Sequence, residues 1–327
     1  MRPRIYLTQP VAQNAIARLQ AVADVTINND PLHIVTKDEL IKAAQEHDII
    51  FCLLHDKIDA DVINANPRLK AIASMTITPA DIDTKAAATR NLPVTVIPAL
   101  LLNDATADMA WSLLMATARR VVEGANTMRA NIFPGSQSNY LEGASVSRKT
   151  LGLLGVGGVG TAMAQRARGF TMNIIYHDPR RLTPDKEHEL GATWAPFDDV
   201  FKHADFVSVH VQLTAQTKHL VGAAQLALMK PSAYLINSAR GPIVDELALV
   251  AALKDKRIAG AGLDVYEHEP KPHPELLTMN NVVCTPHMGS ATRELREAMA
   301  NTVVDNILAV LAGKPPLHAW QGQPYRS

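Results

Sequence analysis

The sequence has few cysteines and no net charge, and both features restrict the class of protein. Its 327 residues include two cysteines, Cys52 and Cys284, which lie inside the apolar runs IIFCLL and NVVCTP. We expect them to be small core residues rather than a disulfide framework, which suits a reducing cytoplasm. Lysine plus arginine equal aspartate plus glutamate, 32 against 32. No global field is therefore expected to draw the protein to nucleic acid or to an anionic membrane.

Long apolar runs and metal-ligand motifs are also missing. No apolar stretch reaches the roughly 18 residues that span a bilayer. The N-terminus MRPRIYLTQP turns into an amphipathic pattern, so neither a signal peptide nor a membrane anchor is expected. No pair of histidines or cysteines has the H-x-x-x-H or C-x-x-C spacing of metal ligands. We therefore expect a cytoplasmic, enzyme-sized protein without a metal.

The stretch from Thr150 to Asp178 reads as a strand, a glycine-rich turn, a helix and a second strand. Gly155, Gly157 and Gly160 stand in G-x-G-x-x-G register directly after the run TLGLL, and Asp178 lies eighteen residues beyond Gly160. This is the dinucleotide-binding fingerprint in its proper context. The glycines allow a tight turn, close approach of a pyrophosphate and close packing of the helix. Asp178 would accept hydrogen bonds from the ribose hydroxyls.

Short β-rich runs alternate with helical patterns along most of the chain. Five such runs precede Pro98, and six more begin at Thr150. This alternation predicts parallel sheets covered on both faces, and the length predicts two domains. The expected fold class is α/β, with two Rossmann-like doubly wound parallel-sheet domains.

Two long helical patterns mark the passages between these domains. The segment from Asn103 to Ala130 reads as one helix with Asp104 as its N-cap, and it is too long for a simple crossover. The last helical pattern, from about Ala291 to Ala312, is expected to return to the first lobe. The nucleotide-binding domain would then be inserted into the substrate domain. The predicted boundaries are 1–99 and 291–327 for the substrate domain and 100–290 for the NAD-binding domain.

Titratable residues stand at the ends of several apolar runs in the second lobe, where ligands bind in open α/β sheets. Arg240 follows INSA, Asp264 and Glu269 lie in GLDVYEHEP, His287 ends VVCTPH, and His210 lies in FVSVHV. Such residues are costly unless paired, and several at one sheet edge predict a site. The alternatives are a helix-edge salt bridge for Arg240 and a buried structural role for His210.

Four ordered motifs, GVGGVG, SARG, DVYEHEP and TPHMGSAT, resemble those of the D-isomer-specific 2-hydroxyacid dehydrogenases. The similarity extends over nearly the whole chain, including PRLKAIASM and ATADMAWSLLMATARR. It implies an NAD-dependent enzyme that interconverts a small 2-oxo acid, such as glyoxylate or hydroxypyruvate, and a D-2-hydroxy acid. It places Arg240, Glu269 and His287 in the catalytic positions. The cofactor site implied by the motifs and the resemblance comprises Gly155, Gly157, Gly158, Val159, Gly160, Asp178, His210, Ser238, Ala239, Arg240, Asp264, His287 and Gly289.

The chemistry of these residue types agrees with the resemblance. Hydride delivery to a carbonyl carbon builds negative charge on the oxygen, and protonated His287 can supply the acid. Glu269 would fix the ring and favour the imidazolium. Arg240 can hold a substrate carboxylate bidentately and polarise the carbonyl.

The loop Met75-Thr76-Ile77-Thr78-Pro79 departs from the family pattern. Relatives usually carry glycines here, and the backbone amides of this loop bind the substrate carboxylate. We expect Thr76, Ile77 and Thr78 to contact substrate together with Arg240 and His287, but the loop does not say which acid binds. The alternative is drift in a tolerant surface loop. Gly158 is a second departure, because many relatives have arginine there.

Two signals bear on the choice of nicotinamide cofactor. Asp178 would accept from the ribose 2′-hydroxyl and repel a 2′-phosphate. Arg180 and Arg181 follow at once, and an arginine pair can bind that phosphate. These arginines lie beyond Pro179 on a turn expected to be exposed, where solvent and salt weaken their pull. We therefore expect NAD, with NADP as a weaker alternative.

The remaining expectations concern partners and competing functions. The resemblance implies a homodimer, with Ala105 to Ala118 and the loop after it as the candidate interface; alternatively, this helix is the core of one subunit. Phosphite dehydrogenase-like oxidation of a small anion is an alternative activity, because those relatives keep the same catalytic residues. Formate dehydrogenases typically pair their histidine with glutamine, so Glu269 argues against formate. A corepressor-like NAD-sensing binding protein is the alternative from another class.

Overall fold

The computed structural model describes residues 2–322 and divides the chain into two compact units. Unit 1 comprises Met1–Leu101 and Ala291–Ser327, and unit 2 comprises Leu102–Ser290. Each unit contains a parallel sheet, which confirms the predicted α/β fold with one domain inserted into the other. Within residues 2–322, no helix combines the length and hydropathy that crossing a membrane requires.

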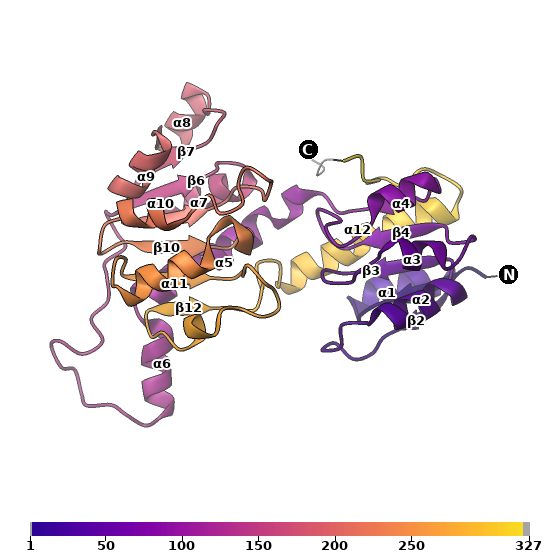
Figure 1. Cartoon of the computed structure of the whole chain (residues 1–327), viewed down its shortest axis with the longest axis horizontal. Coiled ribbons are helices and arrows are strands. Elements are labelled where there is room, and N and C mark those ends of the chain that lie inside the picture. The colour runs from indigo at the N-terminus through magenta and orange to yellow at the C-terminus, as the bar shows by residue number, and fades with distance from the viewer. Residues whose placement is uncertain (1, 323–327) are drawn as a thin grey trace. The chain divides into compact units, whose positions relative to one another are not determined.

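A parallel sheet forms the centre of unit 1 (Figure 1). Its strands are β1 (Arg4–Leu7), β2 (Asp24–Ile27), β3 (Ile49–Cys52), β4 (Ala71–Ser74) and β5 (Val94–Thr95). In the sheet they lie in the order β2-β1-β3-β4-β5. Every residue of β3 and β4 is buried, because helices cover both faces of the sheet.

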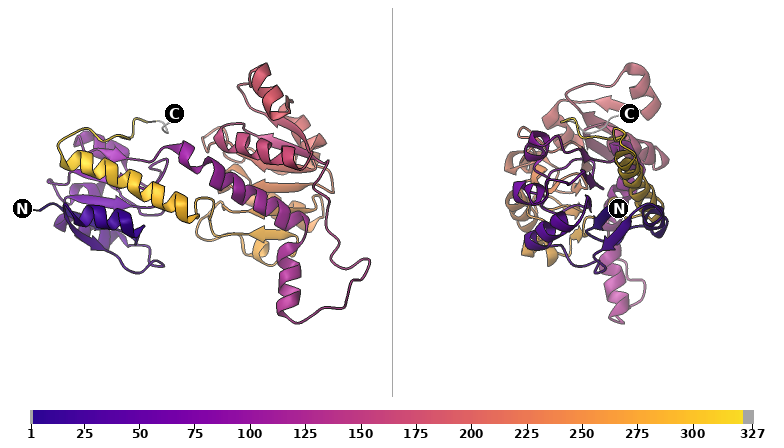
Figure 2. Two further views of the ribbon diagram at one scale, coloured as in Figure 1. Left: turned by 180° about the vertical axis from the view of Figure 1, so that it is seen from behind. Right: turned by 90° about the vertical axis from the view of Figure 1, so that its right-hand side faces the viewer.

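The helices of unit 1 come from both ends of the chain. They are α1 (Gln13–Gln20), α2 (Lys37–Glu46), α3 (Ala60–Asn64), α4 (Thr84–Thr89) and α12 (Arg293–Leu311). α1 and α12 pack together on one face of the sheet, and α2, α3 and α4 cover the other (Figures 1 and 2). The last helix does return to the first lobe, since α12 begins after its N-cap Thr292 and contacts β4.

Unit 2 is built on a larger parallel sheet. Its strands are β6 (Thr150–Leu154), β7 (Asn173–His177), β8 (Ala192–Trp194), β9 (Phe206–Val209), β10 (Tyr234–Asn237), β11 (Gly260–Leu263) and β12 (Val282–Cys284). Their order is β12-β11-β10-β9-β6-β7-β8. The strand order reverses between β6 and β9, so the carboxyl ends of these strands are where a ligand is expected.

Helices cover both faces of this second sheet. The helices of unit 2 are α5 (Asn103–Ala118), α6 (Val121–Arg129), α7 (Gly158–Gly169), α8 (Pro184–Leu190), α9 (Phe197–His203), α10 (Ala223–Leu228) and α11 (Glu246–Lys254), with the 3-10 turns η2 (Gly241–Ile243) and η3 (Pro274–Leu277). α5 and α7 pack together on one face, and α9, α10 and α11 lie on the other (Figures 1 and 2).

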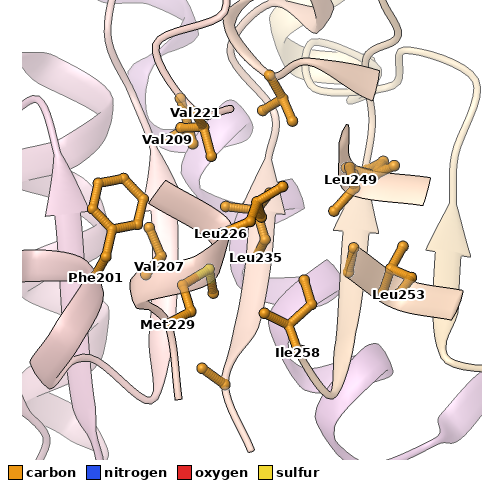
Figure 3. Packing of buried hydrophobic residues seen from close by; sticks show 14 of the residues in the cluster. Phe201, Val207, Val209, Val221, Leu226, Met229, Leu235, Leu249, Leu253 and Ile258 are labelled. Carbon is orange, nitrogen blue, oxygen red and sulfur yellow. The ribbon is translucent and has the colours of Figure 1, made fainter. Parts of the chain in front are cut away.

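The core under α9, α10 and α11 is a continuous apolar layer. Figure 3 shows Val207 and Leu235 of two neighbouring strands among Phe201, Leu226 and Leu253 of the covering helices. All five side chains are at most 3% exposed. Parallel strands covered on both faces consist of unbroken apolar runs.

Three local predictions were wrong. The helix predicted from Asn103 to Ala130 is interrupted at Arg120, whose φ of 53° is left-handed, so α5 and α6 are separate helices. A 3-10 turn, η1 (Ala99–Leu102), leads into α5, and Leu102 rather than Asp104 is the N-cap. Unit 2 also has seven strands where six were predicted. β8 has three residues, too few for a period-two pattern to stand out.

Candidate active site

The glycine turn connects β6 to α7 at the topological switch point. Gly155 has a left-handed φ of 88°, which favours glycine. A Cβ on Gly160 would lie 2.1 Å from the carbonyl oxygen of Gly155, so the helix and the turn approach too closely for any side chain. Gly158, Val159 and Gly160 form the first turn of α7. The local chain path is that of the dinucleotide fingerprint.

The N-terminus of α7 has the features of an anion site. Within residues 2–322 no side chain caps this helix, and the space beside its N-cap Gly157 is open to 4 Å. The unsatisfied amides of a first helical turn, with the helix dipole, favour a phosphate group. The residues present therefore fit a dinucleotide, whose pyrophosphate would be held by the backbone from Gly157 to Gly160.

The absence of a side chain at position 158 has a structural reason. A Cβ on Gly158 would lie 2.2 Å from the side-chain amide of Asn103 at the start of α5. An arginine at this position would require Asn103 to move. Asn103 is thus a neighbour of the glycine turn that sequence spacing did not reveal, because 55 positions separate the two residues in the chain.

Asp178 lies directly after β7 and is held by backbone amides. Its Oδ2 accepts from the N–H of Val156 at 3.2 Å, and its Oδ1 accepts from the N–H of Arg180 at 3.0 Å. Each carboxylate oxygen keeps a further lone pair for a ribose hydroxyl. The first of these bonds ties Asp178 to the glycine turn, which lies at the end of the neighbouring strand β6.

His287 and Glu269 form a hydrogen-bonded pair. Nδ1 of His287 lies 2.7 Å from Oε2 of Glu269, and Oε1 of Glu269 accepts from the N–H of Tyr266 at 3.1 Å. Because a carboxylate only accepts, Nδ1 carries the proton of this bond and Nε2 is the nitrogen left for chemistry. The His287 backbone is left-handed, with φ of 52°, a conformation that non-glycine residues rarely adopt.

Asp264 holds the loop that carries His287. Its side chain is fully buried at the end of β11. Oδ1 accepts from the Thr285 hydroxyl at 2.6 Å and from the Met288 N–H at 2.7 Å, and Oδ2 accepts from the Gly289 N–H at 2.7 Å. These bonds hold the chain on both sides of His287 and thereby stabilise its left-handed backbone conformation. The structure thus reveals a positioning role for Asp264, while its predicted cofactor contact, like that of Gly289, stays a prediction.

Arg240 follows β10 in an extended conformation. Its Nη1 donates to the carbonyl of Ala239 at 2.6 Å, and no carboxylate in residues 2–322 forms an ion pair with it. Burial lowers the pKa of Arg240, and the charge of Glu269 opposes that shift. Arg240 is half-buried, and a partly desolvated cation without a partner anion is costly, so a carboxylate ligand would relieve that cost. The helix-edge salt bridge considered for Arg240 is therefore absent from the described part of the chain.

Asn237 shapes the turn around Arg240, a role that the sequence analysis missed. Its Oδ1 accepts from the N–H of Ala239 at 3.0 Å, and its Nδ2 donates to the carbonyl of Arg240 at 3.1 Å. The signal was an Asn at the end of an apolar run, where such side chains build turns on their own backbone. In the same turn, the hydroxyl oxygen of Ser238 is buried and has no hydrogen-bond partner among the described residues.

His210 lies directly against the glycine turn. A Cβ on Gly155 would lie 2.8 Å from the carbonyl oxygen of His210. Its Nε2 is 2.8 Å from the Ser208 hydroxyl, and burial lowers the pKa of His210 to about 3. The ring is therefore neutral at physiological pH. Its position suits the predicted wall of the cofactor site, and its burial equally suits the structural alternative.

In unit 1, the loop after β4 accommodates its threonines without left-handed backbone. None of residues 75–79 has a positive φ, so the branched side chains carry no such strain. The Thr76 hydroxyl lies 2.7 Å from that of Ser74 and donates to the Thr78 carbonyl at 2.8 Å. It therefore braces the loop itself. The predicted substrate contacts of Thr76, Ile77 and Thr78 stay predictions.

Together, the fold and the residues of unit 2 define a class of protein. A fingerprint turn that fits a dinucleotide, an acid–base pair and an unpaired arginine all follow strands of one sheet. These are the functional groups of a nicotinamide-dependent oxidoreductase that acts on a carboxylate-bearing substrate.

Comparison with known proteins gives the family. Residues 111–289 match the model of the D-isomer specific 2-hydroxyacid dehydrogenase NAD-binding domain. A glyoxylate reductase from Thermococcus litoralis is 40% identical over 320 residues, covering 97% of this chain and 96% of that protein. The chain belongs to the D-isomer specific 2-hydroxyacid dehydrogenase family. It is therefore an oxidoreductase that interconverts 2-hydroxy and 2-oxo acids with a nicotinamide cofactor, and it carries an NAD-binding domain.

Solved structures of similar chains agree. A protein from Thermus thermophilus is 38% identical with a TM-score of 0.90, covering 97% of this chain and all of that one. An NADPH-dependent glyoxylate/hydroxypyruvate reductase from Sinorhizobium meliloti, solved with NADP and malonate, is 31% identical with a TM-score of 0.80. The match covers all of this chain and 99% of that one. The fold and the family predicted from the motifs are thus confirmed.

Proposed function

We propose that the protein reduces a small 2-oxo acid, such as glyoxylate or hydroxypyruvate, to the corresponding 2-hydroxy acid with NADH. The observation that carries this proposal is the 2.7 Å pair of His287 and Glu269, accompanied by the unpaired Arg240. A proton donor and a carboxylate receptor are the two groups that reduction of a 2-oxo acid requires of the protein. The names of the similar proteins support the substrate class.

In this proposal each of the three residues has one task. Bound NADH supplies the hydride. Arg240 binds the substrate carboxylate through its guanidinium and draws electron density from the carbonyl. His287 gives the proton on Nε2 to the carbonyl oxygen as negative charge develops there. Glu269 acts on Nδ1, where it orients the ring and stabilises the positive charge that must be present before the proton is given.

Steady-state turnover of NADH with a panel of 2-oxo acids tests the proposal. We expect glyoxylate or hydroxypyruvate to be reduced with a kcat/KM at least tenfold above that of pyruvate, because the similar proteins are named for these two acids. With NADPH in place of NADH, kcat/KM should be about ten- to a hundredfold lower, since Asp178 repels the 2′-phosphate.

The same assay separates the alternatives. Phosphite with NAD should give no reduced cofactor. Turnover of phosphite, but of no 2-oxo acid, would contradict the proposal and favour oxidation of a small anion. Binding of NADH without turnover of any member of the panel would favour the corepressor-like binding protein.

We also propose that the protein is a homodimer, joined through α6 and the segment after it. No residue of α6 is buried, and large apolar side chains there are exposed. They are Val121 at 55%, Val122 at 44%, Met128 at 59%, Ile132 at 54% and Phe133 at 70%. α5, the first part of the interface expected from the sequence, instead buries its apolar residues against α7 and the sheet of unit 2. Exposed apolar side chains gathered in one segment are typical of a protein–protein contact surface.

Light scattering at micromolar concentration tests the dimer. We expect a mass near twice 35.4 kDa for the native chain, and near 35.4 kDa for Phe133→Asp, because a buried unpaired charge disrupts an apolar interface. Leu247→Asp is the matched control, since Leu247 on α11 is 68% exposed and lies outside this segment. A native mass near 35.4 kDa, or equal effects of both variants, would contradict the proposed interface.

A cytoplasmic location remains part of the proposal. It is supported by Cys52 and Cys284, which are both free thiols, as a reducing compartment permits.

A further inference from the structure

The guanidinium of Arg181 is engaged by a carboxylate of the next helix. Its Nε donates to Oε1 of Glu187 at 2.8 Å, and its Nη2 donates to Oε2 at 2.9 Å. This is the bidentate geometry that arginine also uses for phosphate. Arg181 stands three residues after Asp178, in the turn where a 2′-phosphate on the cofactor ribose would be read. The pair therefore occupies two of the five N–H donors with which this guanidinium could bind an NADP phosphate.

Glu187 is itself anchored from a second direction. Its Oε1 accepts from the hydroxyl of Tyr176, a buried residue of β7, at 2.7 Å. The Tyr176 oxygen in turn accepts from the N–H of Leu182 at 2.9 Å, within the same turn. The Arg181 pair, and then the Tyr176 bond, lower the pKa of Glu187 to about 2, so this carboxylate is charged at physiological pH. The side chain of Glu187 is 13% exposed, against 62% for Arg181.

We propose that Glu187 is a specificity-determining positioning residue that favours NAD over NADP by holding the Arg181 guanidinium away from the ribose 2′-phosphate. The proposal rests on the nicotinamide-dependent function argued above. The two carboxylates act differently: Asp178 repels the phosphate directly, whereas Glu187 removes a cation that would attract it. Since NAD has no 2′-phosphate, the pair should have little influence on NAD binding.

The neighbouring arginine shows why the pair matters. No acidic side chain in residues 2–322 pairs with Arg180, so its guanidinium remains available on the exposed turn. Of the two arginines in this turn, only Arg180 is therefore available to bind a phosphate while Arg181 is held by Glu187. With Arg181 held by Glu187, NADP would gain at most the contact with Arg180, which is screened by solvent and opposed by Asp178.

Glu187→Gln tests the proposal in the full-length enzyme. Glutamine keeps an oxygen for the Tyr176 hydroxyl but loses the charge that holds Arg181. We expect the ratio of kcat/KM with NADPH to kcat/KM with NADH to rise about five- to thirtyfold, as one charge-assisted phosphate contact allows. The values for NADH should change less than twofold.

Glu189→Gln is the matched control. It removes one negative charge from the same helix, but Glu189 pairs with Lys186 and not with Arg181. A general electrostatic effect on a phosphate would raise NADPH use in both variants. Our proposal predicts a rise in Glu187→Gln alone, and equal rises would overturn it.

Arg181→Ala completes a double-mutant cycle. Alone it should leave the cofactor ratio unchanged, because Arg181 is already withheld from the phosphate. In the Glu187→Gln background it should cancel the gain with NADPH. A gain that survives the loss of Arg181 would overturn the proposal.

A binding titration and a second variant complete the test. Titration of each variant with NADP and with NAD, without substrate, measures cofactor preference even if no 2-oxo acid is turned over. Failure of the proposed function can therefore be distinguished from failure of this inference. Glu187→Asp covers the case in which Glu187→Gln does not fold, since the shorter acid keeps its charge but reaches Arg181 less well. For Glu187→Asp we expect a smaller rise in NADP affinity than for Glu187→Gln. If NADP affinity rises in none of the folded Glu187 variants, the inference is overturned.

Discussion

Replacement of His287 by asparagine is expected to lower kcat/KM for 2-oxo acid reduction by about a hundred- to ten-thousandfold, the usual contribution of a positioned proton donor. The reason is that the imidazole Nε2 is the group assigned to protonate the carbonyl oxygen, while Nδ1 is committed to Glu269 at 2.7 Å. Asparagine has no titratable nitrogen. Steady-state kinetics with NADH, together with NADH binding by fluorescence, measure this effect.

The control for this prediction is His268→Asn. His268 is exposed, lies next to Glu269 in the chain, and uses only its carbonyl in a backbone bond to Lys271. We expect that variant to retain activity within about twofold, a difference of about 0.4 kcal/mol. NADH affinity should be nearly unchanged in both variants. If His287→Asn kept activity within a few-fold of the native enzyme, His287 would not be the proton donor.

Replacement of Arg240 by alanine is expected to raise KM for the 2-oxo acid and to lower kcat/KM by about a hundredfold or more, equal to about 2.7 kcal/mol. The guanidinium has no carboxylate partner among the described residues, so the substrate carboxylate is the anion proposed to satisfy it. Removal of such a partner leaves the substrate carboxylate buried and unpaired. Initial rates over a range of substrate concentrations give the separate changes in KM and kcat.

Two comparisons make the Arg240 prediction specific. Arg257→Ala removes another arginine of unit 2, whose side chain donates to the carbonyl of Ala227, and should leave kinetics unchanged. Guanidinium ions added to Arg240→Ala should restore part of the activity, because they replace the missing donor fork. An unchanged KM in Arg240→Ala would show that the substrate carboxylate is bound elsewhere.

Local patterns were sufficient for the backbone of the glycine turn but not for its surroundings. Gly155 and Gly160 were identified from spacing alone, because a left-handed φ and a close helix approach exclude side chains wherever they occur. Asn103 was not identified, although it fills the space beside Gly158. Its position depends on how α5 packs on α7, which no periodicity within either helix encodes.

The two errors in secondary structure have the same origin. The apolar pattern from Asn103 to Ala130 is continuous, so nothing local marked the left-handed residue Arg120. The guanidinium of that residue donates to the carboxylate of Glu123 and to the carbonyl of Glu142, and the second contact joins positions 22 residues apart in the chain. β8 was missed because three residues gain strand structure only through pairing with β7.

The sequence by itself determined the parallel sheets, the site of the dinucleotide turn and the three residues proposed for chemistry. Strand alternation, glycine spacing and charged strand ends are local properties, and the rule that ligands bind at carboxyl strand ends converts them into a site. Only the tertiary structure decided the pairings between distant segments. It showed that Asp264 grips the loop of His287 and that Glu187 holds Arg181. Which carboxylate meets which donor depends on how distant segments pack together, and residue spacing along the chain carries no such information.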